Sequence, residues 1–255
     1  MDSLIPFLDP WQLALALAFG LLAGVVKGMV GFAMPMILIS GLGTFLPPEL
    51  ALAGLILPTV ATNGMQALRQ GVGAAWASLA RFRVFLLVGL ACLLVSAQLV
   101  RSLDPATFLL ALGLPVTGFA VLQLFGFHLR LSRPTALAES VFGAIAGFIG
   151  GLSGVWGPPT VMYLTALDTP KQEQIRIQGV IYGLGALALL GAHIGSGVMR
   201  AETLPFSALL VVPAVLGTWA GGRLHDRIDQ ATFRKATLAV LLIAGLNLLR
   251  RGLAG

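Results

Sequence analysis

Apolar stretches of about 20 residues follow one another along almost the whole chain, and this pattern limits what the chain can fold into. A helix of about 20 apolar residues crosses the ~30 Å hydrocarbon core of a bilayer. Of the 255 residues, 57% are hydrophobic and 10% are charged. An average soluble domain has roughly 25% charged residues. The stretches leave no room for a soluble domain, so the sequence predicts an all-α polytopic membrane protein.

The charged residues support a membrane location rather than a nucleic-acid partner. The net charge is +6, but the basic residues lie in short loops between apolar stretches, as is typical of membrane orientation. Residues 1–10 lack the basic n-region of a cleavable signal peptide, so we expect this segment to remain. Cys92 is the single cysteine, which excludes an intramolecular disulfide and a cysteine-built metal site. We expect no cofactor and no metal.

The two halves of the chain repeat one unit. Residues 19–35 align with residues 142–158 at a constant shift of 123, with identical Phe, Gly, Ala or Pro at seven of 17 positions. A shift of 125 also pairs residues 103–108 with residues 228–233. Internal repeats of this kind determine the architecture of a transporter and usually flank a central site. We therefore predict repeats at 1–127 and 134–255, joined by a cytoplasmic linker at 128–133.

Each half opens with a long apolar segment, 11–42 and about 135–167. Three ordinary spans follow in each half, at roughly 49–68, 79–100 and 104–126 and then at 174–197, 203–222 and 231–249. A continuous helix over 11–42 would be about 48 Å long at 1.5 Å per residue, which is too long for a bilayer unless strongly tilted. We expect both long segments to be broken.

The basic residues favour a path in which each long segment doubles back. If each long segment crossed the membrane once, the halves would be parallel and the two sides would hold eight and seven basic residues. If each segment doubles back, the halves are inverted and the sides hold eleven and four. Because basic residues collect on the cytoplasmic side, we predict inverted repeats in the cell (inner) membrane with both termini outside the cytoplasm. Re-entrant hairpins and paired half-spanning helices both fit this path.

Helix-breaking residues cluster in the middle of both long segments, within 24–35 and 147–159. Glycine permits positive φ, and proline removes a backbone donor, so the helix should unwind there. A half-helix that starts after such a break directs free N–H groups and a positive dipole end at the gap. The pattern predicts an anion site made of backbone. Close helix packing through small residues is the alternative reading, and it is equally suited to Gly20, Gly24, Gly143 and Gly147.

The glycine-rich stretches at 20–35 and 143–159, with the length and the duplication, resemble the TauE/SafE sulfite exporters, the sulfite/organosulfonate transporter family. The likeness covers essentially the whole chain, although its motif consists only of spaced glycines and prolines. It implies secondary transport, commonly export, of sulfite, thiosulfate, sulfoacetate or related anions. Lys27 stands opposite Gly150 in the repeat, so the two half-sites should differ chemically.

Several polar residues within the apolar spans could serve such a site. Lys27 would cost roughly 3 kcal/mol near the bilayer centre, so we expect it to bind the anion, with snorkelling to the interface as the alternative. Asn63 and Gln66 share a helix face and could line a polar path or bond to another helix. We expect no catalytic and no metal-binding residue. The expected substrate-binding residues are Lys27, Gly28, Gly31, Pro35, Asn63, Gln66, Gly151, Ser153, Gly154, Trp156, Pro158 and Tyr182.

The predicted function is secondary transport of a small sulfur-containing anion, as an exporter working by alternating access. Its expected partners are that anion and the lipid bilayer, with a homodimer left open and no nucleic acid. A passive anion channel of similar build is the first alternative. A second is an intramembrane serine protease, because residues 151–154 resemble the Gly-x-Ser-Gly motif of rhomboids and His193 could act as the base. The sequence has no phosphate-binding Gly-x-x-x-x-Gly-Lys-Ser/Thr loop for ATP.

Overall fold

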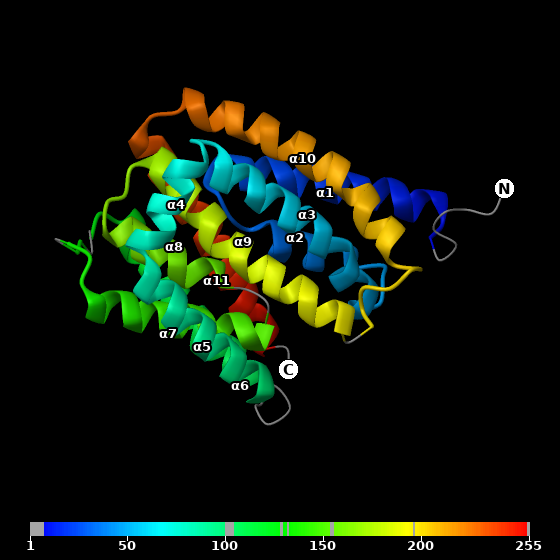
Figure 1. Cartoon of the computed structure of the whole chain (residues 1–255), viewed down its shortest axis with the longest axis horizontal. Coiled ribbons are helices and arrows are strands. Elements are labelled where there is room, and N and C mark those ends of the chain that lie inside the picture. Colours follow the sequence, from blue (N-terminus) through cyan, green and yellow to red (C-terminus); the bar gives the residue numbers. More distant parts are fainter. Residues whose placement is uncertain are drawn as a thin grey trace. The chain divides into compact units, whose positions relative to one another are not determined.

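A computed structural model describes residues 8–99, 105–127, 130–131, 133–153, 156–195 and 197–253, and within these ranges every regular element is a helix (Figure 1). The predicted all-α class is therefore confirmed. In chain order the helices are α1 (Pro10–Val30), α2 (Met34–Leu42), α3 (Pro48–Leu68), α4 (Val72–Arg81), α5 (Arg83–Leu99), α6 (Pro105–Leu124), α7 (Ala136–Ser153), α8 (Gly157–Ala166), α9 (Lys171–Gly195), α10 (Leu204–Arg227) and α11 (Gln230–Leu253).

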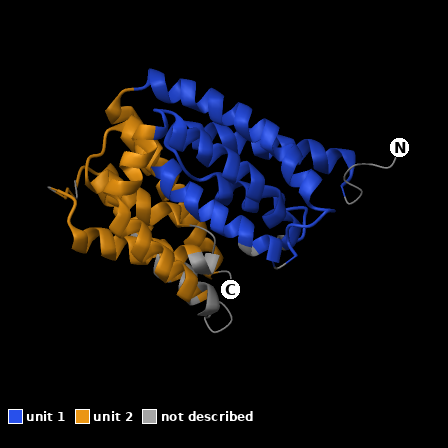
Figure 2. Ribbon diagram, viewed as in Figure 1, with its two compact units in different colours: residues 1–72, 178–228 blue, residues 73–177, 229–255 orange. Residues whose placement is uncertain are grey.

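The helices form two units, each made of two separate stretches of the chain (Figure 2). Unit 1 combines residues 1–72 with 178–228, and unit 2 combines residues 73–177 with 229–255. The packing units are thus interleaved with respect to the predicted sequence repeats at 1–127 and 134–255. The repeats describe similarity along the chain, whereas the units describe which helices pack together, so the repeat boundaries stay a prediction.

Five helices in the described part of the chain are long and apolar enough to cross a membrane: α1, α3, α9, α10 and α11. The α4–α5 pair makes a sixth candidate, but its two helices are bent by 72°. The predicted span at 79–100 is wrong at its start, because residues 79–81 belong to α4 and α5 begins at Arg83. No glycine or proline marks this bend. It buries the side chain of Phe82, which is 1% exposed, against Tyr163 at a ring distance of 6.4 Å.

The first long segment is broken and doubles back, as the sequence predicted. The first break, residues 31–33, separates α1 from α2 and contains Gly31 with φ 93° and Ala33 with φ 75°. A Cβ added at Gly41 near the end of α2 would lie 2.5 Å from the ring of Phe19 in the middle of α1. The hydroxyl of Thr62 lies 3.4 Å from the sulfur of Met34. The two helices therefore run antiparallel, with the break at the tip of the hairpin.

The second long segment follows the same plan. Helix α7 ends at Ser153, and helix α8 begins at Gly157. A Cβ at Gly150 would lie 2.5 Å from the Trp156 ring, and the rings of Phe142 and Tyr163 stack at 5.0 Å. The helices are antiparallel again. Phe142 is the repeat counterpart of Phe19, and each of these side chains packs on the returning helix of its own hairpin.

Contacts inside unit 1 show that α3 and α10 run in the same direction. Near their starts, Arg200 forms an ion pair with Glu49, and at their ends Arg69 pairs with Asp226 at 2.6 Å. Between these pairs, the N–H of Leu57 donates to Ser207 Oγ at 3.2 Å. With one crossing per long segment, α3 and α10 would be the second and seventh crossings and would be antiparallel. The observed direction agrees with doubled-back segments.

Unit 2 gives a second indication of the same kind. A Cβ at Gly113 would lie 2.8 Å from Leu249, and one at Gly245 would lie 2.4 Å from the Thr117 hydroxyl. A later residue of α6 thus contacts an earlier residue of α11, so these helices are antiparallel. One crossing per long segment would make them the fourth and eighth crossings, and hence parallel. The inverted relation between the two repeats stays a prediction, since it concerns the placement of one unit against the other.

Glycines allow one pair of helices in each unit to pack with their backbones in contact. A Cβ at Gly24 of α1 would lie 2.4 Å from the carbonyl oxygen of Ala214 in α10, and one at Gly217 would lie 2.2 Å from that of Leu21. In unit 2, a Cβ at Gly147 of α7 would lie 1.9 Å from the carbonyl oxygen of Gly89 in α5. Small residues permit such approaches between membrane helices. Close packing is therefore the role of Gly24 and Gly147.

Replacing Gly147 with Ala should force α7 away from α5, because the new methyl group has no space beside the Gly89 carbonyl. Overpacking of this kind typically costs about 1–3 kcal/mol. The expected result is a lower thermal unfolding midpoint of the purified protein. The matched control is Gly118→Ala in α6, where an added Cβ meets no atom within 4 Å. Equal midpoints for the two variants would contradict the packing role of Gly147.

Candidate functional site

Lys27 is a buried cation near the tip of the first hairpin. It lies in the last turn of α1, and its residue is 1% exposed. Its ammonium group donates a hydrogen bond to Asn63 Oδ1 on α3. Within the described residues, no carboxylate lies within ion-pair distance of Lys27. An ammonium has three donors, so Asn63 leaves two of them without a partner in this part of the chain.

Side chains from three helices bond to the carbonyl groups at the end of α1. The last carbonyls of a helix have no partners within the helix, and an unsatisfied one is costly in a membrane. Gln66 Nε2 on α3 donates to the Lys27 oxygen at 3.0 Å, and His225 Nδ1 on α10 lies 3.1 Å from the Met29 oxygen. Gln178 on α9, with its amide nitrogen facing the break, donates to the oxygens of Val30 at 3.3 Å and Gly31 at 3.1 Å. The break is therefore held in place by side chains.

One face of α3 presents further polar atoms to the same region. Thr59, Asn63 and Gln66 recur at helical spacing, and their residues are 6%, 0% and 3% exposed. The Thr59 hydroxyl, Asn63 Nδ2 and Gln66 Oε1 are buried and have no hydrogen-bond partner among the described residues. Buried polar atoms are normally paired, so these three atoms suggest that a polar ligand or water completes the site.

The remaining predicted residues of unit 1 have several structural roles. A Cβ at Gly28 would lie 2.2 Å from the Thr218 oxygen, so Gly28 is needed for packing against α10. Gly31 ends α1 in the left-handed conformation, and its N–H donates to the Lys27 oxygen at 2.7 Å. Pro35 lies in the first turn of α2, where it needs no N–H partner. Tyr182 is buried on α9, one turn after Gln178.

Apart from Tyr182, the predicted residues of the second half lie in unit 2. Gly151 and Ser153 are in the last turn of α7, and Gly154 lies outside the described residues. Trp156 precedes α8 and packs over Gly150, and Pro158 is buried in the first turn of α8. Ser153 belongs to unit 2 and His193 to unit 1.

Aromatic rings surround the returning helix of the second hairpin. Tyr163 on α8 is 1% exposed and stacks on Phe85 at 5.9 Å and on Phe142 at 5.0 Å. Its hydroxyl is buried and has no partner among the described residues. Unit 1 therefore places a cation and amides at its hairpin, whereas unit 2 places aromatic rings. The chemical difference between the half-sites, which rests on Lys27 opposite Gly150, stays a prediction.

Sequence reasoning grouped Lys27, Asn63 and Gln66 as site candidates, and the structure brings these three together. It missed His225, which follows the basic residue Arg223 near the end of α10 and looks like part of a membrane boundary. Gln178 was not among its expected substrate-binding residues. No local signal in the sequence marks either residue as a partner of the first break. No group of three or more His, Cys, Asp or Glu side chains suited to a metal ion occurs in the ranges that the structure describes.

These features define a class: a helical multi-pass membrane protein with a broken helix and a buried polar site at the break. A family model described as "Sulfite exporter TauE/SafE" matches residues 16–248. The chain belongs to this family, as its glycine-rich stretches suggested, and it is a membrane transporter. Comparisons with curated proteins and with solved structures give no match.

Replacing Gln66 with Met keeps the length of the side chain but removes the donor to the Lys27 oxygen. The Lys27 oxygen keeps its hydrogen bond from the Gly31 N–H at 2.7 Å, so the variant loses one of two hydrogen bonds. Such a loss costs about 0.5–1.5 kcal/mol, and the thermal unfolding midpoint should fall. The control is Leu68→Met on the same helix, where the side chain is 54% exposed and no polar contact is lost. If the two variants unfold at the same temperature, Gln66 is not needed to hold the first break.

Proposed function

We propose that this transporter exports a small sulfur-containing oxyanion, such as sulfite, thiosulfate or an organosulfonate, and that Lys27 binds it. The family supports the class of anion. The assignment of Lys27 rests on one observation: its ammonium group is buried, and no carboxylate among the described residues lies within ion-pair distance of it. The export direction and an alternating-access mechanism are part of this proposal.

The charge of Lys27 is the physical reason for an anionic ligand. Removing one ammonium group from water costs several kcal/mol unless an opposite charge and hydrogen bonds compensate it. Asn63 supplies only a neutral oxygen. A bound oxyanion would supply the missing negative charge and accept the two spare ammonium donors. Binding is then favourable because no residue that the structure describes gives the site a counter-ion of its own.

Other donors near Lys27 suit a tetrahedral or pyramidal oxyanion. Asn63 Nδ2 is a buried donor with no partner in the described residues. The first turn of α2 begins beside Thr62, and the N–H groups of a first helical turn lack intrahelical partners. Together with the positive end of the α2 dipole, these donors could share the oxygens of one anion. Gly31 and Ala33 would contribute the backbone geometry of the turn rather than side chains.

An outward direction is consistent with the membrane potential. An interior-negative potential drives each negative charge outward by about 2.3 kcal/mol per 100 mV, so export of this kind needs no ATP. We assign the protein to the cell inner membrane with both termini outside the cytoplasm. The eleven basic residues of the doubled-back topology then face the cytoplasm and follow the positive-inside rule.

Replacing Lys27 with Met should abolish anion binding, because the new side chain has a similar length and no charge. In a thermal-shift titration with sulfite and thiosulfate, the wild type should gain stability by mass action. The variant should show at least about a tenfold weaker response, since hydrogen bonds to charged groups contribute about 1.5–3 kcal/mol. Sulfite efflux from proteoliposomes should fall with it.

Lys235→Met is the matched control, because it makes the same substitution at an exposed lysine in α11. This control should bind and export the anions like the wild type. Unchanged affinity in Lys27→Met would remove Lys27 from the site. Equal loss in both variants would point to general charge effects rather than to a site at the first hairpin.

A transporter and a passive channel differ in a counterflow experiment. Proteoliposomes loaded with unlabelled sulfite should take up labelled sulfite faster than empty ones, because an alternating-access site returns more quickly when it carries substrate. A channel would show no such acceleration. Uptake that is independent of the internal sulfite would therefore favour the channel over the proposed mechanism.

A further inference from the structure

A pocket in unit 2 is lined by segments that connect helices, and it shares no residue with the polar site of the first hairpin. Its volume is about 230 Å³. It is smaller than the ~300–1,000 Å³ of sites for drug-sized ligands, which suits a single charged group. The lining residues come from the α4–α5 bend, the connection before α7, the connection before α9 and the first turns of α9: Arg81, Phe82, Leu131, Arg133, Pro134, Leu167, Thr169, Pro170, Glu173 and Ile177.

The lining of this pocket has an excess of positive charge. Arg81 and Arg133 are exposed, and neither has a carboxylate within ion-pair distance among the described residues. The only acidic lining residue, Glu173, is paired with Arg176 at 3.1 Å. Arg176 Nε in turn donates to Ser78 Oγ at 2.8 Å. The charge of Glu173 is therefore already compensated. Arg81, whose guanidinium lies 5.5 Å from the centre of the Phe82 ring, and Arg133 set the character of the pocket.

Apolar side chains line part of the pocket beside the two arginines. Phe82 and Ile177 are each 1% exposed, and Pro134, Leu167 and Pro170 also line the pocket. A guanidinium presents a rigid fork of donors that fits phosphate and carboxylate oxygens in pairs. Two such forks lining one pocket suit an oxyanion better than a neutral or cationic ligand.

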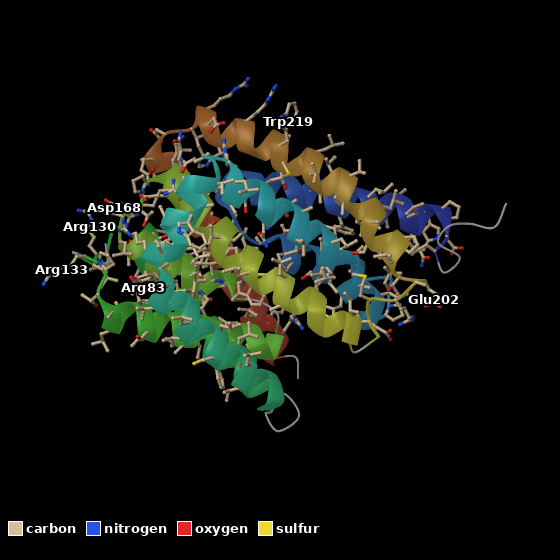
Figure 3. The ribbon with its side chains drawn as sticks, in the orientation of Figure 1. Arg83, Arg130, Arg133, Asp168, Glu202 and Trp219 are labelled. Atoms are coloured by element: carbon tan, nitrogen blue, oxygen red, sulfur yellow. The ribbon has the colours of Figure 1, made fainter. Side chains whose placement is uncertain are left out.

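The surroundings of the pocket suggest the surface of a membrane. The connection that supplies Leu131 and Arg133 also carries Phe125 and Phe127, which are 80% and 70% exposed. Figure 3 shows Arg130 and Arg133 projecting from this connection at one end of unit 2. Aromatic side chains collect at the level of the lipid headgroups, and basic pockets at helix ends bind anionic headgroups.

We propose that Arg81 and Arg133 form a binding site for a phosphate-type oxyanion, supplied either by an anionic lipid headgroup or by free phosphate. The site is separate from Lys27 and does not depend on the proposed transport function. Bound there, the oxyanion would join the α4–α5 bend to the connections before α7 and α9 and so stabilise unit 2.

The test is a thermal-shift titration of the delipidated, purified full-length protein with three probes: phosphatidylglycerol, phosphatidylcholine and inorganic phosphate. Phosphatidylglycerol, phosphate or both should stabilise the wild type, and phosphatidylcholine should do so less. In Arg81→Gln/Arg133→Gln the half-maximal concentration should rise at least about tenfold, from the loss of charge-assisted hydrogen bonds. The single variant Arg133→Gln, in an exposed connection, should show a smaller rise and serves if the double variant does not fold.

Arg83→Gln/Arg130→Gln is the matched control, because it removes the same charge from the same unit at residues that do not line the pocket. It should respond like the wild type. A response to phosphatidylglycerol alone assigns the oxyanion to the lipid, and a response to phosphate alone assigns it to the free ion. The proposal is overturned if neither probe stabilises the wild type, or if control and pocket variants lose the response equally. Lys27→Met should still be stabilised by the same probes as the wild type. The test can therefore overturn this proposal without affecting the proposed transport function, and the reverse also holds.

Discussion

The structure of unit 1 depends on how the carbonyl groups at the end of α1 find hydrogen-bond partners inside a membrane. An interrupted helix leaves backbone groups that hydrocarbon cannot satisfy. Gln66, Gln178 and His225 bond to these carbonyls from three different helices. The hairpin therefore needs α3, α9 and α10 around it, and those same helices bury Lys27. A break that is stabilised in this way can place a cation and a helix N-terminus deep in an apolar protein.

The close packing of α1 on α10 and of α7 on α5 follows from the same requirement. A hairpin that doubles back within the membrane has to pack against a neighbouring span over its full length. Glycines at the contact let the backbones meet, so Gly24, Gly28 and Gly147 have no space for a side chain. The glycine-rich stretches thus combine two functions that look alike in sequence. Gly31 supplies a turn with positive φ, whereas the glycines before it supply a flat helix face.

The helical class, the broken long segments and the group of Lys27, Asn63 and Gln66 could be predicted from sequence, because each rests on local composition and spacing. The interleaved units could not be predicted, since the partner of α1 lies near residue 217 and no local pattern names it. The bend at Phe82 was missed because its cause is the burial of a ring against Tyr163. His225 was missed for a similar reason: its partner is a backbone oxygen 196 positions away, and a backbone oxygen leaves no mark in the sequence.

The interleaving also has a consequence for synthesis of the chain in the cell. The glycine face of α1 meets its partner, Gly217, only after 193 further residues have been made. Until α10 leaves the ribosome, the first hairpin has neither that contact nor the imidazole that bonds to Met29. The nascent first half must therefore wait in the bilayer or its insertion machinery in an unfinished state. Chains that stop before α10 would be natural substrates for membrane quality control.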